Sequence, residues 1–263
     1  MKKIAVINDL SGFGKCSLGV ALPVISAHKI HCVPLATGVF SNQTGYESFK
    51  SVDLTAQMQS FIEEWKKLSA HFDAILTGFI PNYMQGEIIS RFIDDFKSEG
   101  TLVVVDPIMG DNGEIYPCHN EKTIEAVKRI AQKADVITPN QTELALLCGR
   151  EATNDLSEIE AMSRSMNKTV ITTGIHINEN EIANAVCENG SFDIVCCKRL
   201  GESFSGTGDI LASFVTAQLV NGGNALTAVK KATDFISKSI ADTIANPYNT
   251  ADGINFENYL ELI

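Results

Sequence analysis

The sequence predicts an α/β fold: a mostly parallel central sheet with an antiparallel margin, covered by helices on both faces. Three observations predict it. Short β-branched runs alternate with helical patterns, a hairpin pattern follows them, and no linker, low-complexity tract or internal repeat interrupts the chain. Strands joined by crossover helices pair in parallel, and the helices then cover both faces of the sheet. We therefore expect residues 1–263 to form a single domain.

Six short apolar runs predict the strands, because each is rich in β-branched residues and ends in polar residues or in Gly or Pro. They span residues 2–7, 31–37, 72–77, 101–106, 134–138 and 168–173. Two period-2 runs between 180 and 198 flank Asn189-Gly190, a strong signal for a β-hairpin. This hairpin is the expected antiparallel margin.

Apolar residues at helical spacing predict helices between the strands. Residues 53–68 carry one apolar stripe, formed by Leu54, Met58, Phe61, Ile62 and Trp65. Residues 120–134 carry another, formed by Ile124, Val127, Ile130 and Ala131. Two longer helical segments close the chain, at about 207–221 and 224–245.

Charge and composition argue against a nucleic-acid-binding protein and against a membrane protein. The formal net charge is −11 and no basic stripe offsets it, so nucleic acid is not an expected partner. No apolar stretch approaches the roughly 18 residues typical of a membrane span, so no membrane association is expected. The seven cysteines are odd in number and form no C-x-x-C pair, which favours small buried hydrophobic residues in a reducing, cytoplasmic compartment. His28 and His31 flank a strand start, where we expect surface or turn residues.

A glycine-rich turn from Ser205 to Asp209 precedes the helical pattern that starts near residue 207. Glycines allow a close approach to a ligand, and the helix that follows directs unpaired N–H groups and its positive dipole end at that position, which suits a phosphate. Asp209 would then stand within reach of an attacking hydroxyl as a general base. The simpler alternative is that Asp209 only caps the helix.

Asp106-Pro107 and Gly110-Asp111 follow the apolar run 101–106. The carboxylates of Asp106 and Asp111 could hold Mg²⁺ directly or through water, because Mg²⁺ prefers few carboxylates together with phosphate oxygens. An ordinary β-turn that uses Asp as a turn residue remains the alternative.

Asn140 and Glu143 open the helix that follows the run 134–138, and their spacing of three places both on one face. They could point to a metal ion or its waters, or form a reciprocal N-terminal capping box. Thr173-Gly174 ends the next run and could contact nucleotide phosphates. The segment 12–17 is no P-loop, because Asp9 occupies the position of the first glycine and Cys16 the position of the Ser or Thr that meets Mg²⁺.

These motifs follow successive predicted strands and therefore converge on one edge of the sheet. Their combination predicts a phosphotransferase that uses ATP and Mg²⁺. The chain resembles the ribokinase-like superfamily, with its three-layer α/β/α sandwich, and within it the pyridoxal/pyridoxamine kinase family. The resemblance covers essentially the whole chain and lies in Asp106-Pro107 with Gly110-Asp111, in residues 138–143 (TPNQTE) and in residues 206–209 (GTGD).

The resemblance implies a role for each matching residue. Asp209 matches the position of the catalytic base in the family. Gly206, Thr207 and Gly208 match the anion hole for the γ-phosphate. Contacts to the nucleotide are implied for Asp106, Asn140, Thr173 and Gly174, and contacts to Mg²⁺ for Asp111 and Glu143. The resemblance also implies ATP as the phosphoryl donor, K⁺ or another monovalent cation beside the metal, and a homodimer.

On the acceptor side, residues 39–46 resemble the F-S-N-x-T-x-Y stretch of the family. This likeness implies vitamer contacts for Ser11 and Thr44. Phe79 occupies an acceptor-side position where the family often carries Tyr, which removes a hydroxyl. Gln43 stands where several members carry His. The implied reaction is phosphorylation of the 5′-hydroxymethyl group of pyridoxal, pyridoxamine or pyridoxine in vitamin B6 salvage.

Two alternatives stay open. A hydroxymethylpyrimidine kinase of thiamine synthesis shares the fold, but that family typically has Cys at the position of Asp209 and lacks the F-S-N-x-T stretch. A catalytically silent binder of vitamers or nucleotides would use the same motifs for storage or regulation, yet binding phosphate requires no carboxylate beside the anion hole.

Overall fold

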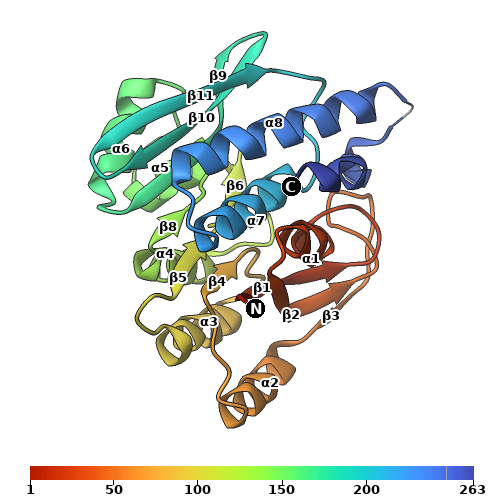
Figure 1. Ribbon diagram of the computed structural model, residues 1–263, viewed down its shortest axis with the longest axis vertical. Helices are drawn as coiled ribbons and strands as arrows, with labels where there is room; N and C mark the ends of the chain where they lie inside the picture. The colour runs from red at the N-terminus through yellow and green to blue at the C-terminus, as the bar shows by residue number, and fades with distance from the viewer. Residues whose placement is uncertain (247) are drawn as a thin grey trace.

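The structure is a computed structural model that describes residues 1–246 and 248–263. A nine-stranded sheet forms its middle layer, with the strand order β11-β10-β9-β8-β5-β4-β1-β2-β3 (Figure 1). The strands are β1 (Lys3–Ser11), β2 (His31–Phe40), β3 (Ser51–Asp53), β4 (Ala74–Thr77), β5 (Leu102–Val105), β8 (Val136–Ile137), β9 (Thr169–Asn178), β10 (Glu181–Glu188) and β11 (Ser191–Lys198).

The six predicted apolar runs form the parallel part of this sheet, from β9 through β8, β5, β4 and β1 to β2. Most of β1, and all of β4 and β8, are buried, as expected for strands with helices on both faces. The predicted hairpin is also confirmed, since β10 and β11 pair in antiparallel register from Glu188↔Ser191 outward. Asn189 and Gly190 both have positive φ at its turn.

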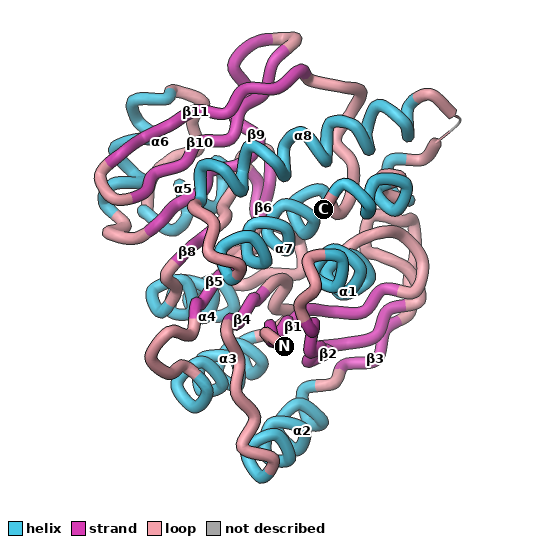
Figure 2. The backbone as a smooth tube through the Cα atoms, in the orientation of Figure 1, coloured by secondary structure: helices cyan, strands magenta, loops and turns pink. Residues whose placement is uncertain are grey.

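Helices cover both faces, which completes the three layers (Figure 2). One face carries α1 (Ser17–Ala27), α7 (Thr207–Val220) and α8 (Ala225–Ile244), together with the 3₁₀ segments η1 (Thr250–Asp252) and η2 (Phe256–Leu262). The other face carries α2 (Thr55–Lys67), α3 (Tyr83–Phe96), α4 (Glu121–Lys133), α5 (Gln141–Cys148) and α6 (Leu156–Ser165). Each face has its own apolar core, so the sheet separates two hydrophobic clusters.

Several details differ from the predictions. Strand β3 adds a second antiparallel margin beyond β2, and β6 (Gly110–Asp111) pairs with β7 (Glu114–Ile115) in a small separate hairpin. Phe61 does not belong to the buried stripe of α2, because its side chain is 47% exposed while Met58 and Ile62 are buried. A stripe drawn from spacing alone was one residue too wide.

His28 lies in the turn after α1, one of the two predicted alternatives, but it is buried: its ring packs edge-on against Phe214 and its Nδ1 is hydrogen-bonded to the carbonyl of Val24. His31 is exposed at the start of β2, as predicted. The cysteines are all free, as expected, but three of the seven are buried and Cys118 and Cys196 are exposed. Within the described ranges, none of the helices combines the length and the apolar character that a bilayer crossing requires.

The strand order places a topological switch point between β1 and β4. From β1 the chain proceeds to β2 on one side, whereas β4 and β5 follow on the other side. In open parallel sheets, the loops diverge at such a point and leave a crevice beyond the carboxyl ends of the strands. The first place to look for a ligand site is therefore the region that follows Ser11 and Thr77.

Candidate active site

Asp209 lies in the first turn of α7, and a side chain from a distant part of the chain holds its carboxylate. The side-chain amide of Asn8, near the end of β1, donates to Asp209 Oδ1 at 3.1 Å. The helix therefore presents Asp209 at the switch point, where the ends of β1 and β4 meet.

The glycine-rich turn that precedes Asp209 has the conformation its sequence suggests. Gly206 is the N-cap residue of α7, with φ 80°, and a Cβ at this position would overlap the carbonyl oxygen of Lys15. Gly208 is exposed. The start of α7 leaves the first N–H groups of the helix without partners inside the helix, which is the arrangement that binds anions.

Asn8 is a residue that the motif analysis did not select. Its Oδ1 accepts from the backbone N–H of Phe79 at 3.0 Å, while its Nδ2 donates to Asp209. Gly78 makes room for it, because a Cβ there would overlap the Asn8 amide. Asn8 directly follows the first predicted strand, residues 2–7. Polar residues at such positions often line a ligand site, and this signal could have selected Asn8.

The predicted nucleotide-side residues also converge. Thr138 Oγ1 donates to Asp106 Oδ1 at 3.0 Å, and Asn140 Nδ2 donates to the carbonyl of Gly110 at 2.8 Å. An isolated parallel bridge joins Asn140 to Thr173. The loops after β5 and β8 and the middle of β9 thus form one connected rim. The predicted strand end at Thr173-Gly174 is wrong, because β9 continues to Asn178 through its pairing with β10.

Glu143 and Asn140 form the reciprocal capping box that was one of the two predicted alternatives for these residues. Asn140 accepts from the Glu143 N–H, and Glu143 Oε2 accepts from the Asn140 N–H at 2.9 Å. Glu143 Oε1 accepts from the Met109 N–H at 3.1 Å, so each of its oxygens meets a backbone amide. The box ties the loop after β5 to α5.

Several carboxylates crowd this end of the sheet. Burial and, to a smaller extent, the nearby charge of Asp9 raise the pKa of Asp209 to about 6. Burial and the charge of Asp209 both raise the pKa of Asp106. Burial and the charge of Asp106 likewise raise the pKa of Glu143. The ion pairs among the described residues involve none of these carboxylates.

This donor set fits a divalent cation that is shared with phosphates. Carboxylates without cationic partners favour Mg²⁺, which usually takes only one or two protein carboxylates and completes its shell with water and phosphate oxygens. Within residues 1–246 and 248–263, no three His, Cys, Asp or Glu side chains gather as a metal site. The described side chains would therefore supply only part of the coordination shell of Mg²⁺, and water and phosphate oxygens would supply the rest.

The acceptor-side residues are less closely grouped. Ser11 is buried and donates to Asp9 Oδ2 at 3.0 Å, and Phe79 lies at the end of β4 with its ring 5.6 Å from that of His119. Thr44 is exposed in the loop between β2 and β3. That loop borders a cavity of about 470 Å³ lined by Phe13, Ser41, Asn42, Tyr46, Glu47 and Ser48.

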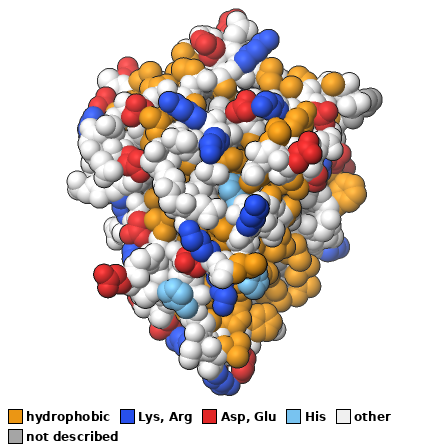
Figure 3. Space-filling view, viewed as in Figure 1, with side chains coloured by type: hydrophobic (Ala, Val, Ile, Leu, Met, Phe, Trp, Pro, Cys, Tyr) orange, Lys and Arg blue, Asp and Glu red, His pale blue; other side chains and the backbone are white. Residues whose placement is uncertain are grey.

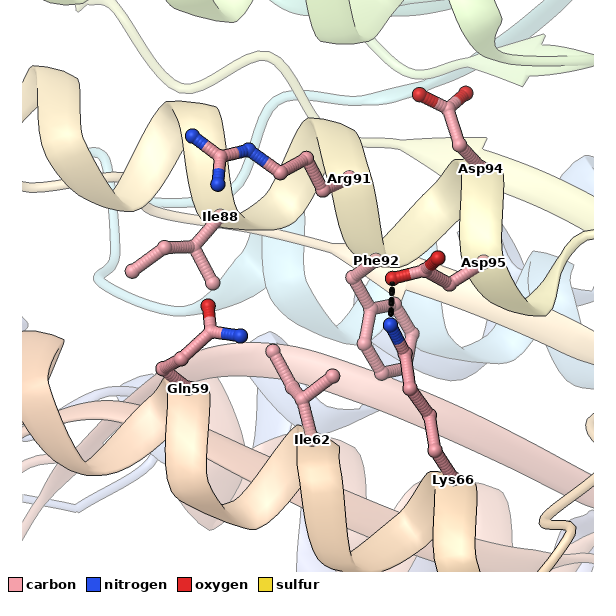
Figure 4. A pocket seen from close by; sticks show the side chains of 8 residues that line it. All are labelled: Gln59, Ile62, Lys66, Ile88, Arg91, Phe92, Asp94 and Asp95. Atoms are coloured by element: carbon pink, nitrogen blue, oxygen red, sulfur yellow. Dashed lines mark ion pairs between the residues drawn. The ribbon is translucent and has the colours of Figure 1, made fainter.

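A second cavity, of about 310 Å³, lies between α2 and α3, on the face of the sheet that does not carry α7 (Figure 4). Lys66 and Asp95 form an ion pair of 2.5 Å across it. None of the predicted site residues lines this cavity. It is a groove between two packed helices, apart from the strand-end site.

The crowded carboxylates should make the ligand-free protein less stable as pH rises. Raised pKa values mean that the folded chain keeps protons that the unfolded chain has released above about pH 4. The unfolding free energy therefore falls as pH rises from about 4 through the raised values, which include about 6 for Asp209.

Asp106→Asn is expected to raise the Tm of the ligand-free protein at pH 8 by about 2–8 °C, or roughly 1–2 kcal/mol. Asn fills the same volume and still accepts from Thr138, but carries no charge. The gain should shrink at pH 5, and calorimetry at both pH values measures it. Glu179→Gln, exposed in the turn between β9 and β10, is the control. A lower Tm at pH 8 would mean that a partner stabilises the ionised carboxylate.

Known proteins share this fold and these motifs. The family model described as phosphomethylpyrimidine kinase matches residues 21–252. A pyridoxal kinase of Leifsonia xyli is 28% identical over 257 residues, which cover 92% of this chain and 89% of the relative. A crystal structure from Bacteroides thetaiotaomicron, described provisionally as a phosphomethylpyrimidine kinase and solved with pyridoxal, is 36% identical with a TM-score of 0.95, over 99% of this chain and 95% of that one.

The pyridoxal kinase of Lactobacillus plantarum is similar as well, at 28% identity and a TM-score of 0.92, over 100% of this chain and 96% of that one. Fold and site together define a small-molecule kinase of the ribokinase-like class. Within that class, the chain belongs to the phosphomethylpyrimidine kinase family, which confirms the predicted superfamily and its three-layer fold.

Proposed function

We propose that this enzyme transfers the γ-phosphoryl group of ATP to the 5′-hydroxymethyl group of a B6 vitamer. The observation that carries the proposal is the placement of Asp209: its carboxylate lies at the start of α7, at the switch point of the sheet, held by the side-chain amide of Asn8. A carboxylate beside a helix start can accept a proton from a hydroxyl while the helix amides bind the phosphoryl group.

The reaction is an in-line displacement at the γ-phosphorus. Asp209 accepts the proton of the attacking hydroxyl, and the backbone amides of Gly206, Thr207 and Gly208 stabilise the negative charge that develops on the phosphoryl oxygens. Asp106, Asn140, Thr173 and Gly174 hold the nucleotide along the strand ends.

Asp111 and Glu143 would hold Mg²⁺, directly or through water, and the ion would neutralise part of the phosphate charge. Glu143 already meets a backbone amide with each oxygen, so its contribution is through an outer water or through the loop that it anchors. A monovalent cation such as K⁺ is required beside the metal. Omission of each ion from the assay in turn tests both requirements.

Ser11, Thr44 and Phe79 form the vitamer side of the site. The choice of a vitamer over hydroxymethylpyrimidine is supported by the pyridoxal bound to the Bacteroides relative and by two relatives named pyridoxal kinase. The family description itself names a pyrimidine substrate. Asp209 favours the vitamer, since Cys is typical of pyrimidine kinases at this position.

A coupled assay tests this choice on purified protein with Mg²⁺ and K⁺. Pyridoxal, pyridoxamine, pyridoxine and hydroxymethylpyrimidine are offered in parallel, each with ATP. We expect kcat/KM for the best vitamer to exceed that for hydroxymethylpyrimidine by about tenfold or more. The reverse preference would assign the enzyme to thiamine synthesis. Ligand binding without turnover of any acceptor would indicate a silent binding protein.

The enzyme acts as a homodimer in the reducing cytoplasm, and the β2–β3 edge is the pairing surface. Apolar side chains gather on this side of the molecule (Figure 3). Leu10, Val39, Phe49 and Val52 are each more than a third exposed there. An exposed strand edge with apolar side chains is a natural place for a second chain to pair.

Val52→Lys is expected to raise the dimer dissociation constant by about tenfold or more, because a charge would be buried in the interface. Light scattering after size exclusion measures the mass across a dilution series. Leu68→Lys, on an exposed side chain just after α2, is the matched control and should leave the mass unchanged. A wild-type protein that is monomeric at all concentrations would contradict the dimer.

A further inference from the structure

Asn8 lies where the two strands that flank the switch point come together. Strands β1 and β4 run in parallel with Ile7 opposite Thr77, and the N–H of Gly78 donates to the carbonyl of Ile7 at 2.9 Å. Asn8 is therefore next to Gly78, at the point where β4 ends. Its side chain is 4% exposed, so the amide needs its hydrogen-bond partners inside the protein.

The hydrogen bonds of the Asn8 amide fix which way it faces. Its Oδ1 accepts from two backbone N–H groups, those of Asp9 and Phe79, each at 3.0 Å. Its Nδ2 donates to Asp209 Oδ1 at 3.1 Å. The reversed amide would place its NH₂ group against two N–H donors and its oxygen against a carboxylate. Asn8 therefore always presents its donor to Asp209.

The neighbouring strand makes room for the Asn8 amide in this orientation. A Cβ on Gly78 would lie 2.3 Å from Asn8 Nδ2 and 2.6 Å from Asn8 Cγ, far inside the contact distance. Gly78 has no positive φ, so its backbone conformation does not by itself require glycine. The close approach of the Asn8 amide is what requires glycine at this position.

The Asn8 amide connects the base to the acceptor side of the proposed site. Phe79 belongs to the acceptor side, and its N–H binds one end of the amide while the Asp209 carboxylate binds the other. A planar amide has no internal freedom between its oxygen and its nitrogen. One side chain therefore sets the separation between the loop after β4 and the first turn of α7.

The same hydrogen bond favours the ionised form of the base. Burial and, to a smaller extent, the charge of Asp9 raise the pKa of Asp209, whereas the donor of Asn8 lowers it. Two other titratable groups interact with Asp209, the carboxylate of Asp106 and the thiol of Cys16. A substitution at Asn8 leaves all three of these neighbours in place, so a change in the titration of Asp209 reports on the Asn8 amide.

We propose that Asn8 is a positioning residue: it holds the Asp209 carboxylate in place relative to the acceptor side of the site, through the amide that also binds the Phe79 N–H. This inference rests on the proposed function, because it assigns Asp209 the role of base. Asn8 acts through Asp209 in this role. A base without this support samples unproductive orientations, which slows the chemical step and leaves nucleotide binding largely intact.

Asn8→Asp separates the two halves of the amide. The new carboxylate keeps an oxygen that accepts from Asp9 and Phe79, but it faces Asp209 with a negative charge in place of a donor. We expect the high-pH plateau of kcat to fall by about 10–100-fold, with KM for ATP within about twofold of wild type. The midpoint of kcat against pH should rise by about one unit or more, because a like charge disfavours ionisation of the base.

Gly78→Ala disturbs the same amide from the other strand. The added methyl group would overlap Asn8 Nδ2, so the amide must turn away from Asp209. The plateau of kcat should fall by about 5–50-fold, and its midpoint should also rise, because the base loses a donor. Asn258→Asp is the control, since this exposed amide of η2 donates to the Asp242 carboxylate of α8 at 3.0 Å. It should change neither the plateau nor the midpoint.

Wild-type turnover is measured first, with the best acceptor, from about pH 5 to about pH 9. No turnover by the wild type would refute the proposed function itself. Turnover by the wild type, with the same plateau and midpoint in a folded Asn8→Asp variant, would overturn only the positioning role. A lower plateau with an unmoved midpoint would overturn it too, because a merely structural side chain would not change the titration of the base. Should Asn8→Asp not fold, Gly78→Ala, which adds one methyl group, decides alone.

Discussion

Asp209→Asn is expected to lower kcat by about 10²–10⁴-fold and to change the affinity for ATP by less than about threefold. The substitution keeps the shape of the side chain and an oxygen that can accept from Asn8. It removes only the capacity to take a proton. Steady-state kinetics with the best acceptor measure the first effect, and titration with a non-hydrolysable ATP analogue measures the second.

The pH profile gives an independent readout of the same base. Burial raises the pKa of Asp209 to about 6. The ionised form is the active one, so wild-type kcat should fall as pH decreases below about 6, and the residual rate of Asp209→Asn should lack this decrease. Weak loss of turnover together with weakened ATP binding would instead mean that Asp209 serves the nucleotide or the helix start.

Gly206→Ala is expected to lower kcat/KM for ATP by at least about 100-fold, a loss comparable to removal of an oxyanion donor. An added Cβ would overlap the carbonyl oxygen of Lys15, and alanine at φ 80° is strained in addition. The turn must shift to relieve the overlap, which moves the amides that we propose bind the γ-phosphate. We also expect the Tm to fall by roughly 5–10 °C.

Gly222→Ala separates strain from overlap. Gly222 follows α7 and has φ 90°, but an added Cβ would meet no atom within 4 Å. It should lose roughly 2–6 °C of Tm from backbone strain alone and keep full activity. Equal loss of activity in the two variants would mean that the anion site does not depend on the geometry of Gly206.

Much of the fold followed from local sequence patterns, because parallel strands buried on both faces must be apolar throughout. The runs at 72–77 and 101–106 became β4 and β5 for this reason. The Asn189-Gly190 pair specified its hairpin through backbone conformation, a property of two adjacent residues.

Features that depend on neighbours distant in the chain were not predictable in the same way. Strand β3 has three exposed residues, so no pattern marks it, and only pairing with β2 makes it a strand. Phe61 fits the spacing of a buried stripe, yet no element covers it. His28 is polar and still buried, because Phe214 and the carbonyl of Val24 receive it.

The sequence by itself determined the kind of chemistry: a carboxylate at a glycine-rich helix start, and polar residues after successive buried strands. Residue types and spacing encode these properties locally. Only the tertiary structure decided which groups hold the base. Asn8 lies about 200 residues before Asp209, and the two meet because β1 and α7 lie together at the switch point. Hydrogen bonds form between neighbours in space, which the order of residues along the chain does not specify.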